Sequence, residues 1–309
     1  MSAFRQKILS VLLILIGLSI GLFGLLYYLS PVTRLELYGT TFDHKVALSK
    51  PTSYLWGWQA HVKSWTERNG QLDTPLADET ADEVSTLLID RQPGTITQNV
   101  LVVKPQEWIR SLKSAGEFKN QTIPTNHPSI APGKIVLDKE GTLLERNAGA
   151  AWRTGRSLQF LIPKFPKGPL RRGSTWTESL EWTETINDWT IGWEGELRWA
   201  VKDFETFDDH PCAKLDYEAA LKPSLRQEAF WAKGSGRDIQ FSGQAHGEAI
   251  FNVREKSLVS NTFTYAGTLK IHIPSLENVP EERRVGFTIS HSEGDVLLQV
   301  NDKMDLRLP

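Results

Sequence analysis

The sequence predicts a mainly β protein: an N-terminal single transmembrane helix, then a long-stranded antiparallel sheet that is strongly curved or a half-barrel, with a few short helices. Two observations predict this fold class. An uncharged apolar run covers residues 8–29, and from Ile135 onward apolar and polar residues alternate in long runs. Such alternation is typical of antiparallel strands with one buried and one wet face. A chain of 309 residues is long enough for about two domains.

The apolar run 8–29 is expected to cross a membrane. Its 22 residues would make a helix of about 33 Å, enough for a hydrocarbon core of about 30 Å. Arg5 and Lys7 precede it, so residues 1–7 are expected to be a cytoplasmic tail and the rest to be exported. This predicts a single-pass signal anchor in the inner (cytoplasmic) membrane, with the C-terminal part in the periplasm or outside. A cleaved signal peptide is the alternative, although its apolar core would be shorter.

Three glycines lie on one side of the expected membrane helix: Gly17, Gly21 and Gly24. Small residues four apart let a second helix approach closely, so they are candidate helix-packing residues for self-association or for a membrane-protein partner. Glycine is also common in membrane helices without any such role.

Residues 30–121 predict a mixed α+β region. Apolar residues alternate from Tyr54 to Val62, and residues 96–103 form a second short apolar strand. Thr74-Pro75 resembles a helix start, so residues 74–88 are expected to be helical, as are residues 105–114. The proline-rich stretch 122–133 is the expected linker to the second domain.

Residues 134–309 predict an antiparallel β domain. A hairpin is expected around the turn 138–141, and long alternating runs follow near residues 176–186, 189–201, 213–221, 241–253, 259–273, 285–289 and 296–300. Strands of about 13 residues would span about 43 Å, so the sheet must twist and curl. Glycines recur on its apolar face and suit bends or close approach; they are Gly195, Gly243, Gly247 and Gly267.

Aromatic residues gather on the apolar face of the second domain. They fill the core of the sheet or line an apolar ligand groove. The ligand-lining candidates are Trp182, Trp189, Trp193, Trp199, Phe263 and Tyr265.

Four segments carry a resemblance to known proteins: LDKEGTLLERN, FLIPKFPKGPLRRGSTW, FDDHPCAKLDYEAAL and GQAHGEAIFNVREKSLVSNTFTY. Together with the G-x-[ST]-W motif at Gly173–Trp176, they make residues 131–275 similar to exported β-rich bacterial domains of unknown function. The shape of those domains is similar to the lipoprotein-carrier half-barrels. The resemblance implies a curved sheet and an envelope location, and it implies no catalytic residues.

Composition and motifs exclude several functions. A net charge of -2 argues against nucleic acid as a partner, and a single cysteine excludes an intramolecular disulfide. No nucleophile elbow, zinc-protease, Walker or dinucleotide motif is present, so we expect no cofactor, no metal and no catalysis. The sequence therefore predicts a non-enzymatic, membrane-anchored envelope scaffold or accessory subunit. The alternative is a carrier of lipid or another apolar ligand in the concave face of the sheet, and a third possibility is an enzyme of an unrecognised type.

Overall fold

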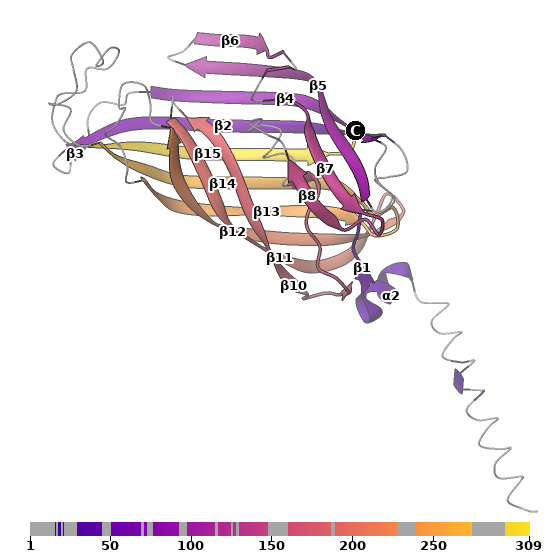
Figure 1. Cartoon of the computed structure of the whole chain (residues 1–309). Coiled ribbons are helices and arrows are strands. Elements are labelled where there is room, and N and C mark those ends of the chain that lie inside the picture. The colour runs from indigo at the N-terminus through magenta and orange to yellow at the C-terminus, as the bar shows by residue number, and fades with distance from the viewer. Residues whose placement is uncertain are drawn as a thin grey trace, which may run out of the picture.

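The computed structural model describes residues 16, 18, 19, 21, 30–44, 51–68, 71–72, 77–92, 98–114, 117–124, 126–127, 130–147, 160–186, 189–227, 239–273 and 294–309. Most of them belong to one 13-stranded antiparallel sheet (Figure 1). In chain order the elements are α2 (Pro31–Tyr38), β1 (Thr40–Thr41), β2 (Thr52–Arg68), β3 (Gln71–Leu72), β4 (Ala77–Gln92), β5 (Gln98–Ser114), β6 (Glu117–Thr122), β7 (Gly133–Asp138), β8 (Leu143–Asn147), β9 (Pro169–Leu170), β10 (Thr175–Ile186), β11 (Trp189–Phe207), β12 (His210–Gln227), β13 (Ile239–Asn252), β14 (Ser257–Ile273) and β15 (Gly294–Arg307).

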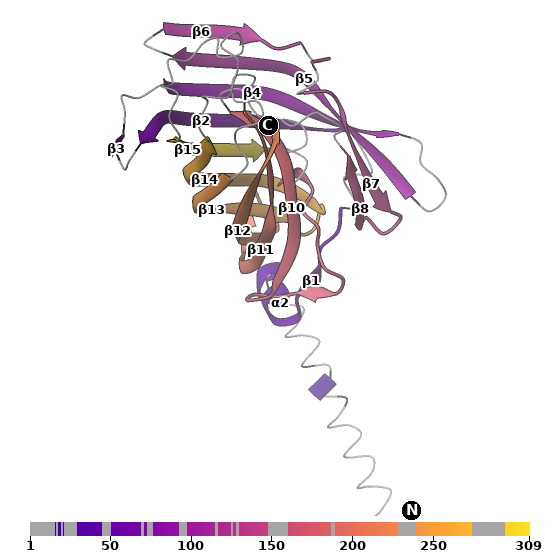
Figure 2. The ribbon, with the colours of Figure 1, turned by 60° about the vertical axis from the view of Figure 1, so that its left-hand side comes forward.

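The order of strands places the last strand beside the first long strand in the middle of the sheet. It runs β10-β11-β12-β13-β14-β15-β2-β4-β5-β7-β8, with β3 on β2 and β6 on β5. The last strand, β15, pairs with the first long strand, β2. Figure 2 shows the sheet curving from β6 round to β10. A separate two-stranded pair, β1 with β9, lies beside α2.

The alternating residues of β11 define the two faces of the sheet. Trp193 and Trp199 are fully buried, whereas Glu194, Glu196 and Arg198 are exposed. The register predicted from the alternation is therefore confirmed for this strand. Apolar residues of one parity build the core on the concave side, and charged residues of the other parity face water.

Three of the glycines on the apolar face lie against aromatic rings: Gly243, Gly247 and Gly267. A Cβ on Gly247 would come within 2.3 Å of the ring of Tyr217, and one on Gly243 within 2.5 Å of Phe241. Only glycine leaves the space that these rings occupy. The close approach expected at these glycines is confirmed.

The predicted fold class is wrong in its helices. Residues 77–92 and 98–114 form β4 and β5, where residues 74–88 and 105–114 were expected to be helical. β4 pairs with β2 on one side and with β5 on the other, and this pairing overrides the local helix signals. Pro105 is accommodated because the register shifts between Ser85 and Leu87 of β4, where β5 carries one extra residue.

Among the described residues, α2 is a short helix that the sequence did not predict. Ser30 caps it by accepting a hydrogen bond from Thr33 N (3.1 Å), and Pro31 occupies the first turn. The predicted membrane helix 8–29 lies almost entirely outside the described residues. Within the part of the chain that the structure describes, no helix is both long and apolar enough to cross a membrane.

The boundary predicted between the mixed region and the β domain does not divide the sheet. β2, β4 and β5 come from the first region, and they continue the same sheet as β10–β15 of the second. The stretch 122–133 connects β6 to β7, and both of these strands pair with β5.

Candidate functional site

Residues 160–165 of the chain cover part of the concave face of the sheet. The ring of Phe160 stacks on Phe263 at 4.4 Å between centroids, and its carbonyl accepts a hydrogen bond from Asn261 Nδ2 (2.7 Å). Leu161, Ile162 and Phe165 are also buried. The concave face is therefore filled here by the protein's own chain.

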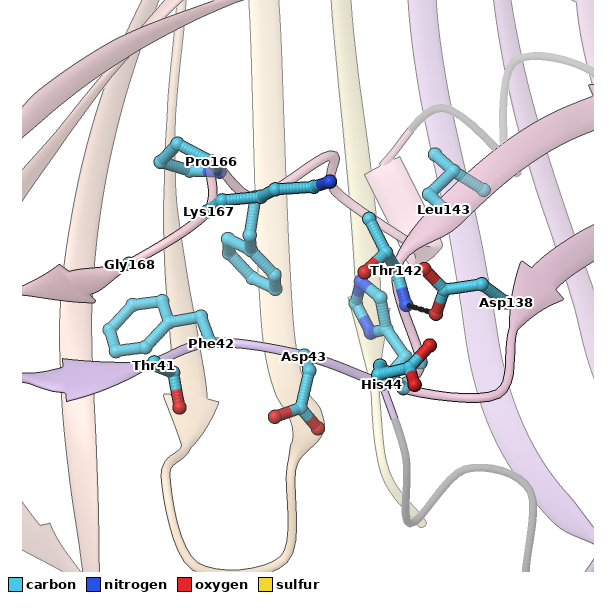
Figure 3. Close-up of a pocket in the computed structure, with 13 residues that line it drawn as sticks. Thr41, Phe42, Asp43, His44, Asp138, Thr142, Leu143, Pro166, Lys167 and Gly168 are labelled. Carbon is cyan, nitrogen blue, oxygen red and sulfur yellow. Dashed lines mark hydrogen bonds between the residues drawn. The ribbon is translucent and has the colours of Figure 1, made fainter.

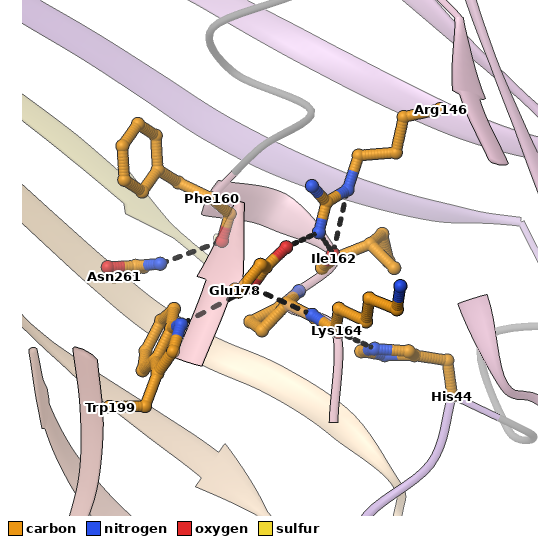
Figure 4. A network of polar contacts seen from close by, with 9 residues as sticks. His44, Arg146, Phe160, Ile162, Lys164, Glu178, Trp199 and Asn261 are labelled. Atoms are coloured by element: carbon orange, nitrogen blue, oxygen red, sulfur yellow. Dashed lines mark hydrogen bonds and ion pairs between the residues drawn. The ribbon is translucent and has the colours of Figure 1, made fainter. Parts of the chain in front are cut away.

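A buried ion pair holds this segment between the two edges of the sheet (Figure 4). Arg146 of β8 donates to Glu178 of β10, and it also donates from Nε to the carbonyl of Ile162 (3.1 Å). The second oxygen of Glu178 accepts from the backbone of Lys164 (3.0 Å) and from Trp199 Nε1 (3.2 Å). Every charged group of the pair has hydrogen-bond partners, as burial requires. These contacts link β8, β10 and the segment between them.

Next to this network lies a cavity of about 430 Å³ (Figure 3). Three segments that are distant in sequence form its walls: residues 41–44 after β1, the turn 138–143 between β7 and β8, and residues 165–168 before β9. Small-ligand sites have volumes of about 300–1,000 Å³, so this cavity is large enough to hold one.

The cavity has an aromatic wall. The rings of Phe42 and Phe165 meet edge to face at 5.1 Å, and the imidazole of His44 stacks on Phe165 at 5.1 Å. Phe251 packs behind them, 5.3 Å from Phe42. These contacts fix the rings in place and present an apolar surface to whatever enters.

His44 is held as a neutral imidazole. Its Nε2 lies 2.8 Å from the carbonyl of Pro163, and its backbone N–H donates to the carbonyl of Gly141 (3.0 Å). Burial lowers the pKa of His44 from 6.5 to about 4, and the positive charge of Arg146 acts in the same direction. His44 is thus a packing and hydrogen-bonding residue at neutral pH.

Charges of both signs line the cavity. Asp43 pairs with Lys256 (3.6 Å), and Glu140 lies 3.7 Å from Lys139. Asp138 accepts the backbone N–H of Thr142 at its Oδ1 (2.7 Å). Lys167 extends over the cavity (Figure 3), and no described residue forms an ion pair or hydrogen bond with its ammonium group.

A second, shallower hollow of about 280 Å³ lies elsewhere on the sheet, across β15, β2, β4 and β5. Its lining includes Leu55, Gly57, Val84, Ile109 and Arg307. Leu55 and Val84 are exposed there. The buried Ser85 also lines it.

The predicted ligand-lining residues do not lie in either cavity. Trp182, Trp193, Phe263 and Tyr265 are buried and pack on one another. Trp199 is buried against Trp176 and Tyr217. The side chain of Trp189 is outside the described residues, as are Gly17 and Gly24. An added Cβ on Gly21 would meet nothing within 4 Å.

Metal binding was not expected, and the described residues contain no group of three or more ligands placed to hold a metal ion. Asp208 and Asp209 form the tip of the β11–β12 hairpin with φ of 47° and 62°. Cys212 is buried, and burial raises the pKa of its thiol to about 11. It is therefore protonated at neutral pH.

Sequence reasoning missed the residues that form the network and the cavity. The sequence could have indicated Glu178, because Glu178 lies on the same face of its strand as Trp176 and Leu180. A carboxylate on that apolar face needs a buried partner. The cavity carried none, because residues 41–44, 138–143 and 165–168 are brought together only by tertiary structure.

The comparisons with known proteins give no family. No protein-family model matches the chain, and no curated protein matches it. Similar solved structures include the outer membrane protein OprG from Pseudomonas aeruginosa, with a TM-score of 0.25, 6% identity and coverage of 86% of this chain and 97% of that chain. They also include Salmonella typhi OmpF in complex with daunomycin, with a TM-score of 0.23, 10% identity and coverage of 82% of this chain and 97% of that chain. A BenF-like porin from Pseudomonas fluorescens matches with a TM-score of 0.19, 7% identity and coverage of 83% of this chain and 98% of that chain. At these TM-scores the matches transfer no function to this chain.

The predictions from the sequence differ from these matches. The sequence predicted a single-pass inner-membrane signal anchor that acts as a scaffold with a membrane-protein partner, whereas the matched structures are outer membrane proteins and porins. At TM-scores of 0.25 and below, this difference carries no argument about the location or function of this chain. The resemblance to exported β-rich domains of lipoprotein-carrier-like shape stays a prediction. The alternative prediction, an apolar ligand or lipid on the concave face, is contradicted, since residues 160–165 and packed aromatic rings fill that face where it is described.

Proposed function

We propose that this protein is a non-enzymatic binding protein that takes a small organic ligand into the cavity between residues 41–44, 138–143 and 165–168. The observation that carries the proposal is the combination in one cavity of an aromatic wall with a lysine that no described residue pairs. Ligand sites are mostly apolar, with a few polar groups that fix orientation. This cavity has that composition.

The titratable groups near the cavity support binding rather than catalysis. His44 Nε2 is engaged by a backbone carbonyl, and its pKa is lowered to about 4, so it is a weak base. Asp43 is held by Lys256, and one oxygen of Asp138 accepts the backbone N–H of Thr142. A general base needs a pKa near the working pH and a free approach to the substrate, and His44 has neither.

The test fills the cavity and compares binding with a matched control. Thr142 lines the cavity, so Thr142→Trp should block it. Leu144, two residues further along, is exposed and outside the lining, so Leu144→Trp adds the same bulk harmlessly. Saturation-transfer NMR would be recorded with a mixture of soluble organic fragments.

Fragments that bind the wild type and Leu144→Trp but not Thr142→Trp would support the proposal. Binding that survives in Thr142→Trp, or no binding to the wild type, would reject it. Circular dichroism and thermal unfolding of both variants show whether the added indole has disturbed the fold.

A further inference from the structure

The charges of the cavity have an arrangement that the proposed function leaves unexplained. Lys167 belongs to the segment before β9, and Asp138 to the turn after β7, so the two charges enter the cavity from different walls (Figure 3). Among the ion pairs of the described residues, none joins Lys167 to Asp138. A positive and a negative group therefore face one hollow with space between them.

The other charged lining groups are already compensated. Asp43 lies 3.6 Å from Lys256, whose ammonium also donates to the carbonyl of Thr41. Glu140 lies 3.7 Å from Lys139. Their fields largely cancel at the distance of a bound ligand, so Lys167 and Asp138 remain as the two groups that a ligand can complement.

Asp138 keeps its charge available although it stabilises the turn. Only its Oδ1 is used by the N–H of Thr142 (2.7 Å), and a carboxylate can accept further hydrogen bonds at its other oxygen. The Thr142 bond also fixes the direction in which the carboxylate points. Lys167 supplies up to three donors on a flexible stem, so it can adjust to the position of an anionic group.

Resting on the proposed function, we infer that the ligand is a zwitterion with an apolar side chain, of the α-amino acid class. Its carboxylate binds Lys167, its ammonium group binds Asp138, and its side chain packs on the aromatic wall of Phe42 and Phe165. A zwitterion satisfies both charges of the cavity at once. Lys167 is exposed and Asp138 is half-buried, so a simple anion or a simple cation complements only one of the two charged groups and gains less from the site.

Four probes with the same benzyl body separate the charge requirements: phenylalanine (zwitterion), N-acetylphenylalanine (anion), phenylalaninamide (cation) and 2-phenylethanol (neutral). Isothermal titration calorimetry of the full chain in mild detergent would measure each. Phenylalanine should bind at least tenfold more tightly than either singly charged probe, a difference of about 1.4 kcal/mol.

Two variants assign the charges. Lys167→Met keeps the length of the side chain and should remove the preference of the site for phenylalanine over phenylalaninamide. Asp138→Asn keeps an acceptor for the Thr142 N–H and should remove the preference over N-acetylphenylalanine. Lys134→Met and Glu145→Gln change the same charges at exposed positions outside the cavity and should change no affinity.

The possible outcomes separate this inference from the proposed function. If a singly charged or neutral probe binds as tightly as phenylalanine, the zwitterion inference is rejected while the cavity remains a binding site. If no benzyl probe binds, the inference is also rejected, and the Thr142→Trp comparison with a fragment mixture decides independently whether the cavity binds anything. Equal affinities for the wild type and both cavity variants would likewise overturn it.

Discussion

At the scale of single residues, His44 makes the stability of the fold depend on pH. Its buried imidazole has a pKa of about 4 in the folded state, against 6.5 for an ordinary histidine. The unfolded chain therefore binds a proton at this residue more readily than the folded protein does. The stability that depends on the neutral ring is complete above pH 6.5 and is lost as the pH falls from 6.5 toward 4.

We expect His44→Gln to reduce the acid sensitivity of the protein. Urea unfolding of both proteins at pH 7.5 and pH 4.5 measures the effect. The wild type should lose about 2–3 kcal/mol more than the variant between these two pH values, because glutamine does not titrate. Carboxylates titrate in both proteins, so their contribution cancels in the difference. Equal losses would show that His44 does not carry this pH dependence.

Two glycines of the sheet should respond to alanine in opposite directions. A Cβ on Gly247 would lie 2.2 Å from the carbonyl oxygen of Thr262 and 2.3 Å from the ring of Tyr217. Gly247→Ala should therefore destabilise the fold by about 1–3 kcal/mol. Near Gly57 the added atom would meet only the carbonyl of Asp305 at 4.0 Å, so Gly57→Ala should stabilise by about 0.5–1 kcal/mol. Chemical denaturation of both variants would check this pair, and a loss of stability at both positions would contradict it.

At the scale of elements, the ion pair of Arg146 and Glu178 holds residues 160–164 between β8 and β10. Glu178→Leu should destabilise the protein by about 3–5 kcal/mol, because it leaves the guanidinium of Arg146 buried without its anion. The double variant Arg146→Met with Glu178→Leu should recover most of this loss. The exposed control Glu196→Gln should cost less than about 0.5 kcal/mol. A double-mutant cycle from urea unfolding gives the coupling energy, and additive losses would mean that the pair does not act as a unit.

The sequence predicted elements well where one face of a strand is uniformly apolar. The inward tryptophans and outward glutamates of β11 fix its register without any knowledge of its neighbours. The prediction from the sequence failed where buried positions are polar. In β4, Glu83 and Ser85 face inward, so apolar and polar residues do not alternate visibly, and the acidic residues at the start of the strand resemble the first turn of a helix. Glu83 is tolerated there because Trp108 Nε1 donates to it (2.9 Å) and Arg110 lies nearby (3.5 Å). Those partners lie on β5, about 25 residues away in sequence, and no local pattern shows them.

At the scale of the whole molecule, the sheet depends on one strand, β15, that joins its early strands to its late strands. β15 pairs with β14 on one side, and with β2 on the other from Asp295–Glu67 to Arg307–Leu55. The strands β2, β4 and β5 have no other connection to the β10–β14 part of the sheet in the described pairings. The domain boundary predicted near residues 122–133 therefore separates segments that share a ladder and a core.

This continuity predicts that the described sheet unfolds in one cooperative step. Differential scanning calorimetry should show a single transition whose calorimetric enthalpy equals its van't Hoff enthalpy, and tryptophan fluorescence and far-ultraviolet circular dichroism should coincide through it. Leu298→Ala, in the centre of β15, removes a buried side chain at the junction and should cost about 2–5 kcal/mol while it lowers the whole transition without splitting it. Leu101→Ala in β5 removes an equally buried leucine far from the junction and serves as the matched control. Two separate transitions in the wild type, or a Leu298→Ala transition that divides into two while that of Leu101→Ala does not, would show that the two regions fold as independent units despite their shared sheet.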